Sequence, residues 1–237
     1  MSALHPDVLV IAEVAAAPEG WWTGVAASAR AAAEAGVNAV RVDPPRSLPS
    51  ASAEGWIALR KAVLRSDVDF LVTVSRPEDV SLLRRVGVGG LAASVANDGG
   101  EGFWEALGAA HLPLFLLCDG DTEEPMRRAL AILDRYDVGV TVIFGQADRP
   151  ASPERLGLGR LHEVELGGRV SRGFADRSGT GWPVLAACFL GADALEIPLS
   201  LSPYLPEPAG ALDPGGLRRA VEGLRYLAWV RAHPRAP

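Results

Sequence analysis

The sequence predicts an α/β protein, a single-domain (β/α)8 barrel of the TIM type. Short, β-branched apolar runs alternate with Ala-, Leu- and Arg-rich segments along the chain, a pattern typical of repeated βα units around a parallel sheet. Eight such units fit into the 237 residues, close to the size of about 250 that is typical of this barrel. With 49% hydrophobic residues, a large core can form without disulfides or zinc.

Each expected strand is a short apolar run. The eight runs are residues 8–14, 39–42, 70–74, 90–93, 114–118, 139–144, 170–175 and 194–199. The clearest helical segments between them are 24–35, 53–65, 123–136, 182–190 and 214–230, with a further helix entry at 75–79. Pro214 suits a first helical turn. The sixth helix is the weakest, because Gly157, Gly159 and Gly167 interrupt its pattern. We expect the barrel to span 1–232 and a loose tail to span 233–237.

Composition argues against several classes of protein. The net charge of -6 and the absence of a Lys/Arg cluster disfavour nucleic acid as a partner. The apolar run at residues 8–17 is interrupted by Glu13 and has no basic segment before it, so it predicts neither a signal peptide nor a membrane span. We therefore expect a cytoplasmic protein with no membrane partner.

The few lysines and histidines limit the chemistry of the site. Lys61 is the single lysine, and it falls on the second helix, outside the barrel. The four histidines, His5, His111, His162 and His233, fall at the N-terminus, before the fifth strand, on the sixth helix and in the tail. Lysine Schiff-base chemistry and a His-ligated metal are disfavoured by this placement. We expect neither a metal nor a cofactor.

Carboxylates and arginines remain at the C-terminal ends of the strands, where barrels of this type carry their active sites. The expected catalytic acids and bases are Glu13, Asp43, Asp176 and Glu196. The expected substrate-binding residues are Arg41, Thr73, Asp119, Arg177 and Ser178. A purely structural interpretation stands beside this one: Glu13 could pair with Arg41, and Glu196 with Arg177 or Arg41, as ion pairs that hold the end of the barrel.

Three other features are ambiguous. Cys118 has no histidine nearby to lower its pKa, which favours a core thiol over a nucleophile. Trp21 and Trp22 follow the first strand, where they could stack on a sugar ring or simply pack. The glycine loop at residues 177–181 opens a helix after the seventh strand, where barrels often bind phosphate, but ordinary turn chemistry is the favoured explanation.

Several of these segments together resemble the sialic acid synthases, which condense phosphoenolpyruvate with an N-acyl sugar in a metal-dependent TIM barrel. Residues 10–14 (VIAEV) are similar to the first-strand motif IAEIG of that family, and residues 35–43 (AGVNAVRVD) to AGADAVKFQ. The likeness extends over nearly the whole chain through residues 70–73, 113–116, 173–176, 183–192, 195–196 and 205–208. The resemblance implies the same barrel, and it matches polar family positions at Glu13, Thr73, Asp176 and Glu196.

The same resemblance implies that the family's chemistry has been lost. Arg177 and Pro198 stand at the two metal-histidine positions, and Arg41 and Ala92 at the positions of lysines directed at phosphoenolpyruvate. Residues 117–119 replace the phosphate cradle, which puts Asp119 where an anion would sit. The antifreeze-like domain of the family has no counterpart. We therefore predict that phosphoenolpyruvate condensation is lost, because a carboxylate repels this ligand.

Two functions follow as hypotheses. The first is a metal-independent enzyme that acts on a sugar-like or polyol small molecule by carboxylate acid/base chemistry. The alternative is a non-catalytic pseudoenzyme that binds a partner protein or a small ligand, for example beside a complete synthase. The quaternary structure, a homodimer or a heteromeric complex, is left open, with Trp21, Trp22, Trp56 and Trp229 as candidate interface residues.

Overall fold

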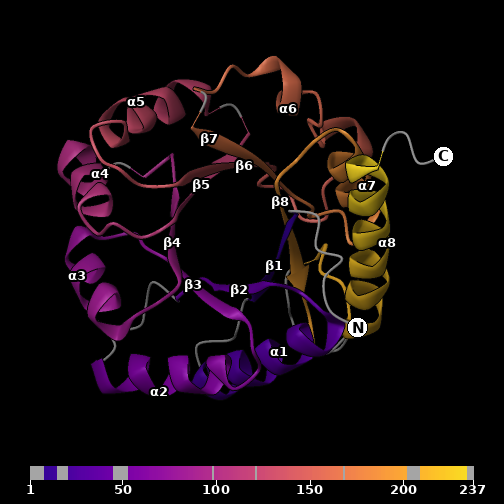
Figure 1. The fold of residues 1–237 in the computed structure, drawn as a ribbon, viewed down its shortest axis with the longest axis horizontal. Helices are drawn as coiled ribbons and strands as arrows, with labels where there is room; N and C mark the ends of the chain where they lie inside the picture. The colour runs from indigo at the N-terminus through magenta and orange to yellow at the C-terminus, as the bar shows by residue number, and fades with distance from the viewer. Residues whose placement is uncertain are drawn as a thin grey trace.

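Eight parallel strands close into a barrel in the order β1 to β8, and helices surround it (Figure 1). The computed structural model describes residues 8–14, 21–44, 53–97, 99–120, 122–167, 169–201 and 209–233. The predicted single-domain (β/α)8 barrel is confirmed. Residues 234–237 of the expected tail and the side chains of Trp21 and Trp22 lie outside what is described.

The strands agree closely with the apolar runs of the sequence. They are β1 (Leu9–Val14), β2 (Ala39–Val42), β3 (Asp69–Thr73), β4 (Gly90–Ser94), β5 (Leu114–Asp119), β6 (Val140–Gly145), β7 (Val170–Ala175) and β8 (Ala194–Leu199). Three of the eight ranges, those of β2, β7 and β8, match the prediction at both ends. The others shift by one residue at one or both ends, because a strand begins and ends where ladder pairing does and not where apolar residues do.

The helices follow the strands in regular alternation. They are α1 (Trp21–Ala35), α2 (Ala53–Leu64), α3 (Pro77–Val86), α4 (Gly100–Gly108), α5 (Glu123–Leu133), α6 (Arg160–Glu163), α7 (Trp182–Phe189) and α8 (Pro214–Ala232). The predicted weakness of the sixth unit is confirmed, because α6 has only four residues and follows a short 3-10 turn, Pro153–Arg155. Asp213 caps α8 through its carboxylate, and Pro214 opens the first turn as predicted.

Alternation along each strand divides the core into two parts. Side chains that point inward fill the barrel, and these are Leu9, Ile11, Ala39, Leu71, Ala92, Phe115, Leu117, Ile143 and Ala175. Side chains that point outward pack against the helices in a second, larger cluster. In every strand the inward positions recur at every second residue. This spacing decides which polar residues at the strand ends enter the barrel.

Two expectations about the surface can be compared with the structure. Trp56 is buried and packs against Phe70, with ring centroids 6.3 Å apart, so its expected role at an interface was wrong. Its side chain faces the barrel because it shares the inner side of α2 with Leu59 and Val63. Trp229 does lie partly exposed on α8. Among the residues described, no helix combines the length and the apolar character needed to span a bilayer.

Candidate active site at the barrel mouth

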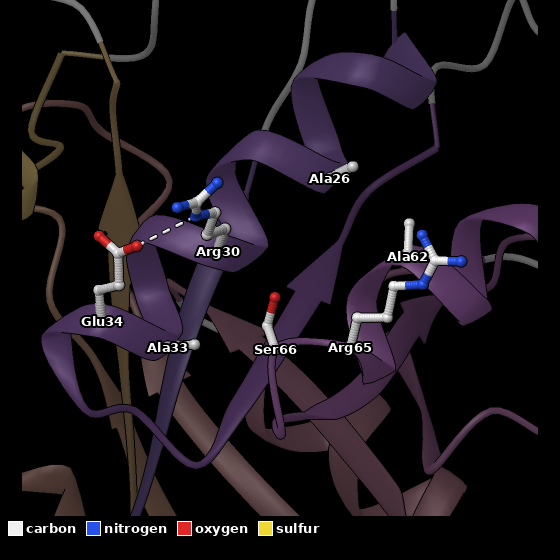
Figure 2. Close-up of a pocket in the computed structure, with 7 residues that line it drawn as sticks. All are labelled: Ala26, Arg30, Ala33, Glu34, Ala62, Arg65 and Ser66. Carbon is white, nitrogen blue, oxygen red and sulfur yellow. Dashed lines mark hydrogen bonds and ion pairs between the residues drawn. The ribbon is translucent and has the colours of Figure 1, made fainter.

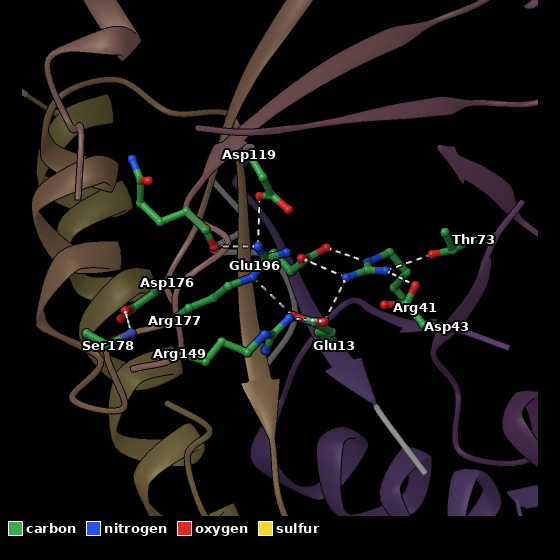
Figure 3. Close-up of polar contacts among 11 residues, drawn as sticks. Glu13, Arg41, Asp43, Thr73, Asp119, Arg149, Asp176, Arg177, Ser178 and Glu196 are labelled. Atoms are coloured by element: carbon green, nitrogen blue, oxygen red, sulfur yellow. Dashed lines mark hydrogen bonds and ion pairs between the residues drawn. The ribbon is translucent and has the colours of Figure 1, made fainter. Parts of the chain in front are cut away.

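The strand register gathers the predicted polar residues at one end of the barrel. Glu13 pairs in register with Arg41 on one side and with Pro198 on the other. Glu196 pairs with Ile11, so it starts one layer deeper than Glu13. Ile11 lies two residues before Glu13 and in register with Glu196, and it belongs to the interior cluster, so both glutamate side chains also point into the barrel. We call this end, with Glu13, Arg41, Asp43, Thr73, Asp119, Arg149, Arg177 and Glu196, the mouth (Figure 3).

Arg41 is the centre of the mouth and is completely buried. Its Nε and Nη2 donate to the two carboxylate oxygens of Glu196 at 2.7 and 3.0 Å, a bidentate pair. Its Nη1 donates to Asp43 and, at 2.7 Å, to the hydroxyl of Thr73. Oε1 of Glu13 also lies 3.2 Å from Nη2. The guanidinium of Arg41 therefore links its own strand, β2, to β1, β3 and β8. The structural ion pairs Glu13–Arg41 and Glu196–Arg41 that the sequence suggested are both present.

Glu13 connects Arg41 to two further arginines. Its Oε1 accepts a hydrogen bond from Nη2 of Arg149 at 2.6 Å, and its Oε2 lies 3.8 Å from Nε of Arg177. Arg177 in turn reaches Asp119 at 2.7 Å and donates to the backbone carbonyl of Gln146 at 2.6 Å. The mouth is thus one continuous network in which Arg41, Arg149 and Arg177 face Glu13, Asp43, Asp119 and Glu196.

The two buried glutamates have pKa values displaced in opposite directions. Burial raises the pKa of Glu13, but Arg41, Arg177 and Arg149 outweigh it and bring the pKa down to about 2. Burial of Glu196 raises its pKa; Arg41 opposes this rise, while the negative charge of Glu13 adds to it. Two carboxylates on the same guanidinium nitrogen therefore bind protons over different pH ranges, a separation often found in acid/base sites.

Some polar atoms in this network are buried and have no hydrogen-bond partner. They include Oε2 of Glu13, Nε of Arg177 and Nη1 of Arg149. The first two are 3.8 Å apart, too far for a direct hydrogen bond but close enough for one oxygen atom to bridge them. A hydroxyl group has the matching chemistry for this bridge, because it can accept from Arg177 and donate to Glu13.

Asp176 and Ser178 lie apart from the network (Figure 3). Ala175 belongs to the interior cluster, so the next residue, Asp176, points outward. Its Oδ1 accepts from the backbone nitrogen of Ser178 at 2.8 Å, close to the start of α7. Burial raises the pKa of Asp176, and hydrogen bonds from Ser178, Gly181 and Val184 partly oppose the rise.

The glycine loop before α7 already uses its own polar groups. The hydroxyls of Ser178 and Thr180 are 2.8 Å apart, and each accepts from a backbone nitrogen further along the loop. Gly179 has a φ of 76°, and a Cβ there would come within 3.2 Å of the Gly210 backbone. The segment around Gly210 therefore covers the loop, which does not favour the phosphate interpretation.

Two arginines near the mouth were missed in the sequence. Arg149 and Arg160 follow β6 within the weak sixth unit, where no periodic pattern indicated which side chains turn inward. Arg160 donates to the carbonyl of Cys118 at 3.2 Å and lies over the ring of Phe144, 4.8 Å from its centroid. One signal in the sequence could have indicated them. The strand ends carry more carboxylates than arginines, and because buried carboxylates are nearly always paired, further arginines had to lie nearby.

The lysine and the three histidines that the structure describes lie where the sequence predicted. Lys61 is on α2, His162 is on α6, and His111 lies between α4 and β5. His233 follows α8 and stacks on Trp229, while His5 lies outside the described residues. Cys118 is completely buried in the core cluster, as expected of a core thiol, and this burial raises its pKa to about 12.

The mouth does not fit the divalent metal that the family resemblance would imply. The two positions of the family's histidines hold Arg177, a cation, and Pro198, which has no donor atom to offer. Within the described ranges, no group of three or more His, Cys, Asp or Glu side chains is placed to hold a metal ion. The carboxylates that are present are instead directed at guanidinium groups.

Surface grooves lie away from the mouth, between helices of the outer ring. One of about 590 Å³ runs between α1 and α2 (Figure 2) and is lined by Ala26, Arg30, Ala33, Glu34, Ala62, Arg65 and Ser66. Arg30 and Glu34 form an exposed i,i+4 ion pair within it, at 3.1 Å. Such a pair contributes little to stability. The groove holds none of the residues singled out in the sequence.

The fold and the mouth together define a (β/α)8 barrel with an ion-paired, carboxylate- and arginine-lined end. No family model and no curated protein match the chain. Solved structures share its fold: the N-acetylneuraminic acid (sialic acid) synthetase of Leptospira borgpetersenii, in complex with citrate, has a TM-score of 0.85 at 15% identity, covering 97% of this chain and 87% of that one.

Two further solved structures extend the comparison. A spore coat polysaccharide biosynthesis protein of Bacillus subtilis has a TM-score of 0.86 at 22% identity, covering 96% of this chain and 70% of that one. A truncated 3-deoxy-D-arabino-heptulosonate 7-phosphate synthase of Thermotoga maritima has a TM-score of 0.72 at 14% identity, covering 93% and 86%. The resemblance to a divergent sialic acid synthase barrel is thus confirmed at the level of the fold.

Proposed function

We propose that the protein is a cytoplasmic, metal-independent enzyme that acts on an uncharged, sugar-like or polyol small molecule at the barrel mouth by carboxylate acid/base chemistry. The observation that carries the proposal is that Oε2 of Glu13 and Nε of Arg177, an ion pair 3.8 Å apart, both lack a hydrogen-bond partner. A sugar hydroxyl can satisfy both at once. The fold shared with proteins named for sugar biosynthesis supports the same substrate class.

The charge balance favours an uncharged ligand. Arg41, Arg149 and Arg177 are already matched by four carboxylates within the network. An anion such as phosphoenolpyruvate would have to compete with those carboxylates and would be repelled by them. This argument supports the predicted loss of phosphoenolpyruvate condensation.

The residues divide into three roles in this proposal. Glu13 stays ionised, because its pKa is about 2, and orients a substrate hydroxyl as an acceptor. Asp43, partly exposed at the edge of the mouth, exchanges the proton with solvent as the general acid or base. Arg41 and Glu196 lie underneath and hold Glu13 in place, with the raised pKa of Glu196 letting its charge respond to pH. Asp176 has no role in this site.

The test is ligand-induced stabilisation followed by turnover. Thermal unfolding is measured with neutral hexoses, hexitols and N-acyl hexosamines, and separately with sugar phosphates, phosphoenolpyruvate and manganese. A neutral ligand at about 100 times its dissociation constant should add about 2.7 kcal/mol. The stabilisation should be lost in Glu13→Gln and kept in the control Glu34→Gln, on the outer groove. Asp43→Asn should keep binding and lose turnover, measured by NMR on the stabilising ligand.

Either of two results would overturn the proposal. Stabilisation by manganese with phosphoenolpyruvate would mean that the family's chemistry persists. No stabilisation by any compound would favour the second candidate, a non-catalytic relative that binds a partner. The specific observation behind that candidate is Arg41, which is completely enclosed and has carboxylate or hydroxyl partners on all three nitrogens, as expected of a purely structural ion pair.

A further inference from the structure

The helix α7 is apolar on every side. Its eight residues, WPVLAACF, include no charged, amide or hydroxyl side chain. A helix of this kind is normally covered all round by protein. Yet Trp182 is 72% exposed and Phe189 is 69% exposed, and because they are seven residues apart they lie on the same side of the helix. Between them, Ala186 is exposed and Leu185 is half-buried.

The exposed apolar surface continues onto α8. Leu185 packs over Gly223, where a Cβ would come within 2.9 Å of its side chain. Arg231 donates to the carbonyl of Cys188 at 2.7 Å, so the C-terminal half of α8 lies beside the end of α7. On that half, Tyr226 is 69% exposed and Val230 is also exposed. We call these residues the aromatic face: Trp182, Leu185, Ala186, Phe189, Tyr226 and Val230.

The neighbouring helices of the ring leave this face uncovered. In Figure 1, α6 lies between α5 and α7 and is much shorter than the other helices of the ring. It packs mainly on β7, whereas α7 packs on α8 and the ring continues through α1 to α5. Other outer surfaces are charged, as on α3, where Glu78, Arg84 and Arg85 are exposed. On α8 the exposed apolar positions Tyr226 and Val230 lie next to the exposed charges Glu222 and Arg225, so the apolar exterior of this sector is α7 with those two residues.

We propose that the aromatic face is the interface of a homodimer, in which two copies of the chain pack α7 and α8 against each other across a two-fold axis. Such an interface uses the same surface on both copies. The three exposed rings leave roughly 400–500 Å² in water, a large part of the about 800 Å² per partner that a stable complex buries. None of the six residues is charged, so pairing the face with itself brings no like charges to its centre.

The oligomeric state tests this inference, which does not depend on the proposed function. Light scattering during gel filtration should give twice the chain mass of 24.9 kDa at micromolar concentration. Phe189→Glu with Tyr226→Glu, which places like charges on both copies, should give the monomer mass and keep a cooperative thermal transition. The matched control is Ile57→Arg on α2, 40% exposed, which should remain a dimer.

Each other outcome contradicts the inference. A wild-type protein that stays at the monomer mass up to about 100 μM leaves the face free for a different partner, and the homodimer is wrong. A dimer that persists in the double variant places the interface elsewhere. If the double variant unfolds, the dimer dissociation constant is measured instead for Phe189→Ala and Tyr226→Ala, which add no charge. The inference then requires a dissociation constant at least tenfold higher than that of the wild type.

Discussion

The two ends of the barrel interior differ sharply in composition. Below the mouth the interior is packed with apolar side chains, among them Leu9, Ile11, Leu71 and Phe115. The mouth above them holds three arginines and four carboxylates in one network. Buried apolar side chains stabilise the folded barrel by leaving water. Buried charged side chains destabilise it unless each has an oppositely charged or hydrogen-bonding partner. The position of this network, at the end where barrels of this type carry their active sites, supports the proposal that the mouth binds a substrate.

Removing the central cation should have the largest effect. In Arg41→Met, Glu196 and Glu13 lose the guanidinium between them, and we expect a loss of about 3–5 kcal/mol in the free energy of unfolding. Urea denaturation followed by circular dichroism measures it. Arg41→Lys keeps the charge but not the bidentate geometry, so it should recover only part of the loss. A change below about 1 kcal/mol in Arg41→Met would show that the network is not coupled to folding.

A cavity in the apolar layers should cost somewhat less. Leu71→Ala removes a buried, inward-pointing side chain from the packed layer, and we expect about 2–4 kcal/mol by urea denaturation. The matched control is Leu64→Ala on the outer surface of α2, which should change stability by less than about 0.5 kcal/mol. If Leu71→Ala exceeds Arg41→Met, the lower layers and not the network dominate the stability of the barrel.

The contribution of Glu13 should depend on pH. Its pKa is about 2 when folded, against an ordinary value of 4.5, so the unfolded chain binds the proton first as the pH falls. The stabilisation is therefore present above pH 4.5 and is lost between pH 4.5 and 2, on the order of 3 kcal/mol. Comparing wild type with Glu13→Gln isolates it, because the two curves should converge toward pH 2. A constant difference would contradict the assignment.

The smallest effect is expected at Asp176, outside the network. Asp176→Ala removes the acceptor for the Ser178 backbone nitrogen near the start of α7, at a cost of about 1 kcal/mol. Asp176→Asn keeps an oxygen acceptor and should recover most of it, as measured by thermal unfolding. Neither variant should change ligand binding at the mouth. Loss of binding in Asp176→Asn would return this residue to the site.

The sequence predicted much of the fold but only part of the site. The apolar runs predicted all eight strands to within one residue at each end, because most inward and outward positions of a buried parallel strand are apolar. Seven of the nine predicted site residues lie in the network of the mouth, and Asp176 and Ser178 do not. Because side chains alternate along a strand and Ala175 points inward, Asp176 could have been excluded from the sequence alone. Arg149 could not have been predicted, because it lies in a loop without a periodic hydrophobic pattern.

The sequence by itself determined the barrel, the end of it that carries polar residues, and the absence of lysine and histidine from the strand ends, since all three follow from pattern and position along the chain. Only the tertiary structure decided which charges pair. Arg41 and Glu196 are 155 positions apart and meet because β1 lies between β2 and β8 in the closed barrel. The exposed aromatic face was likewise decided by packing, since burial depends on which helices are neighbours and how long they are.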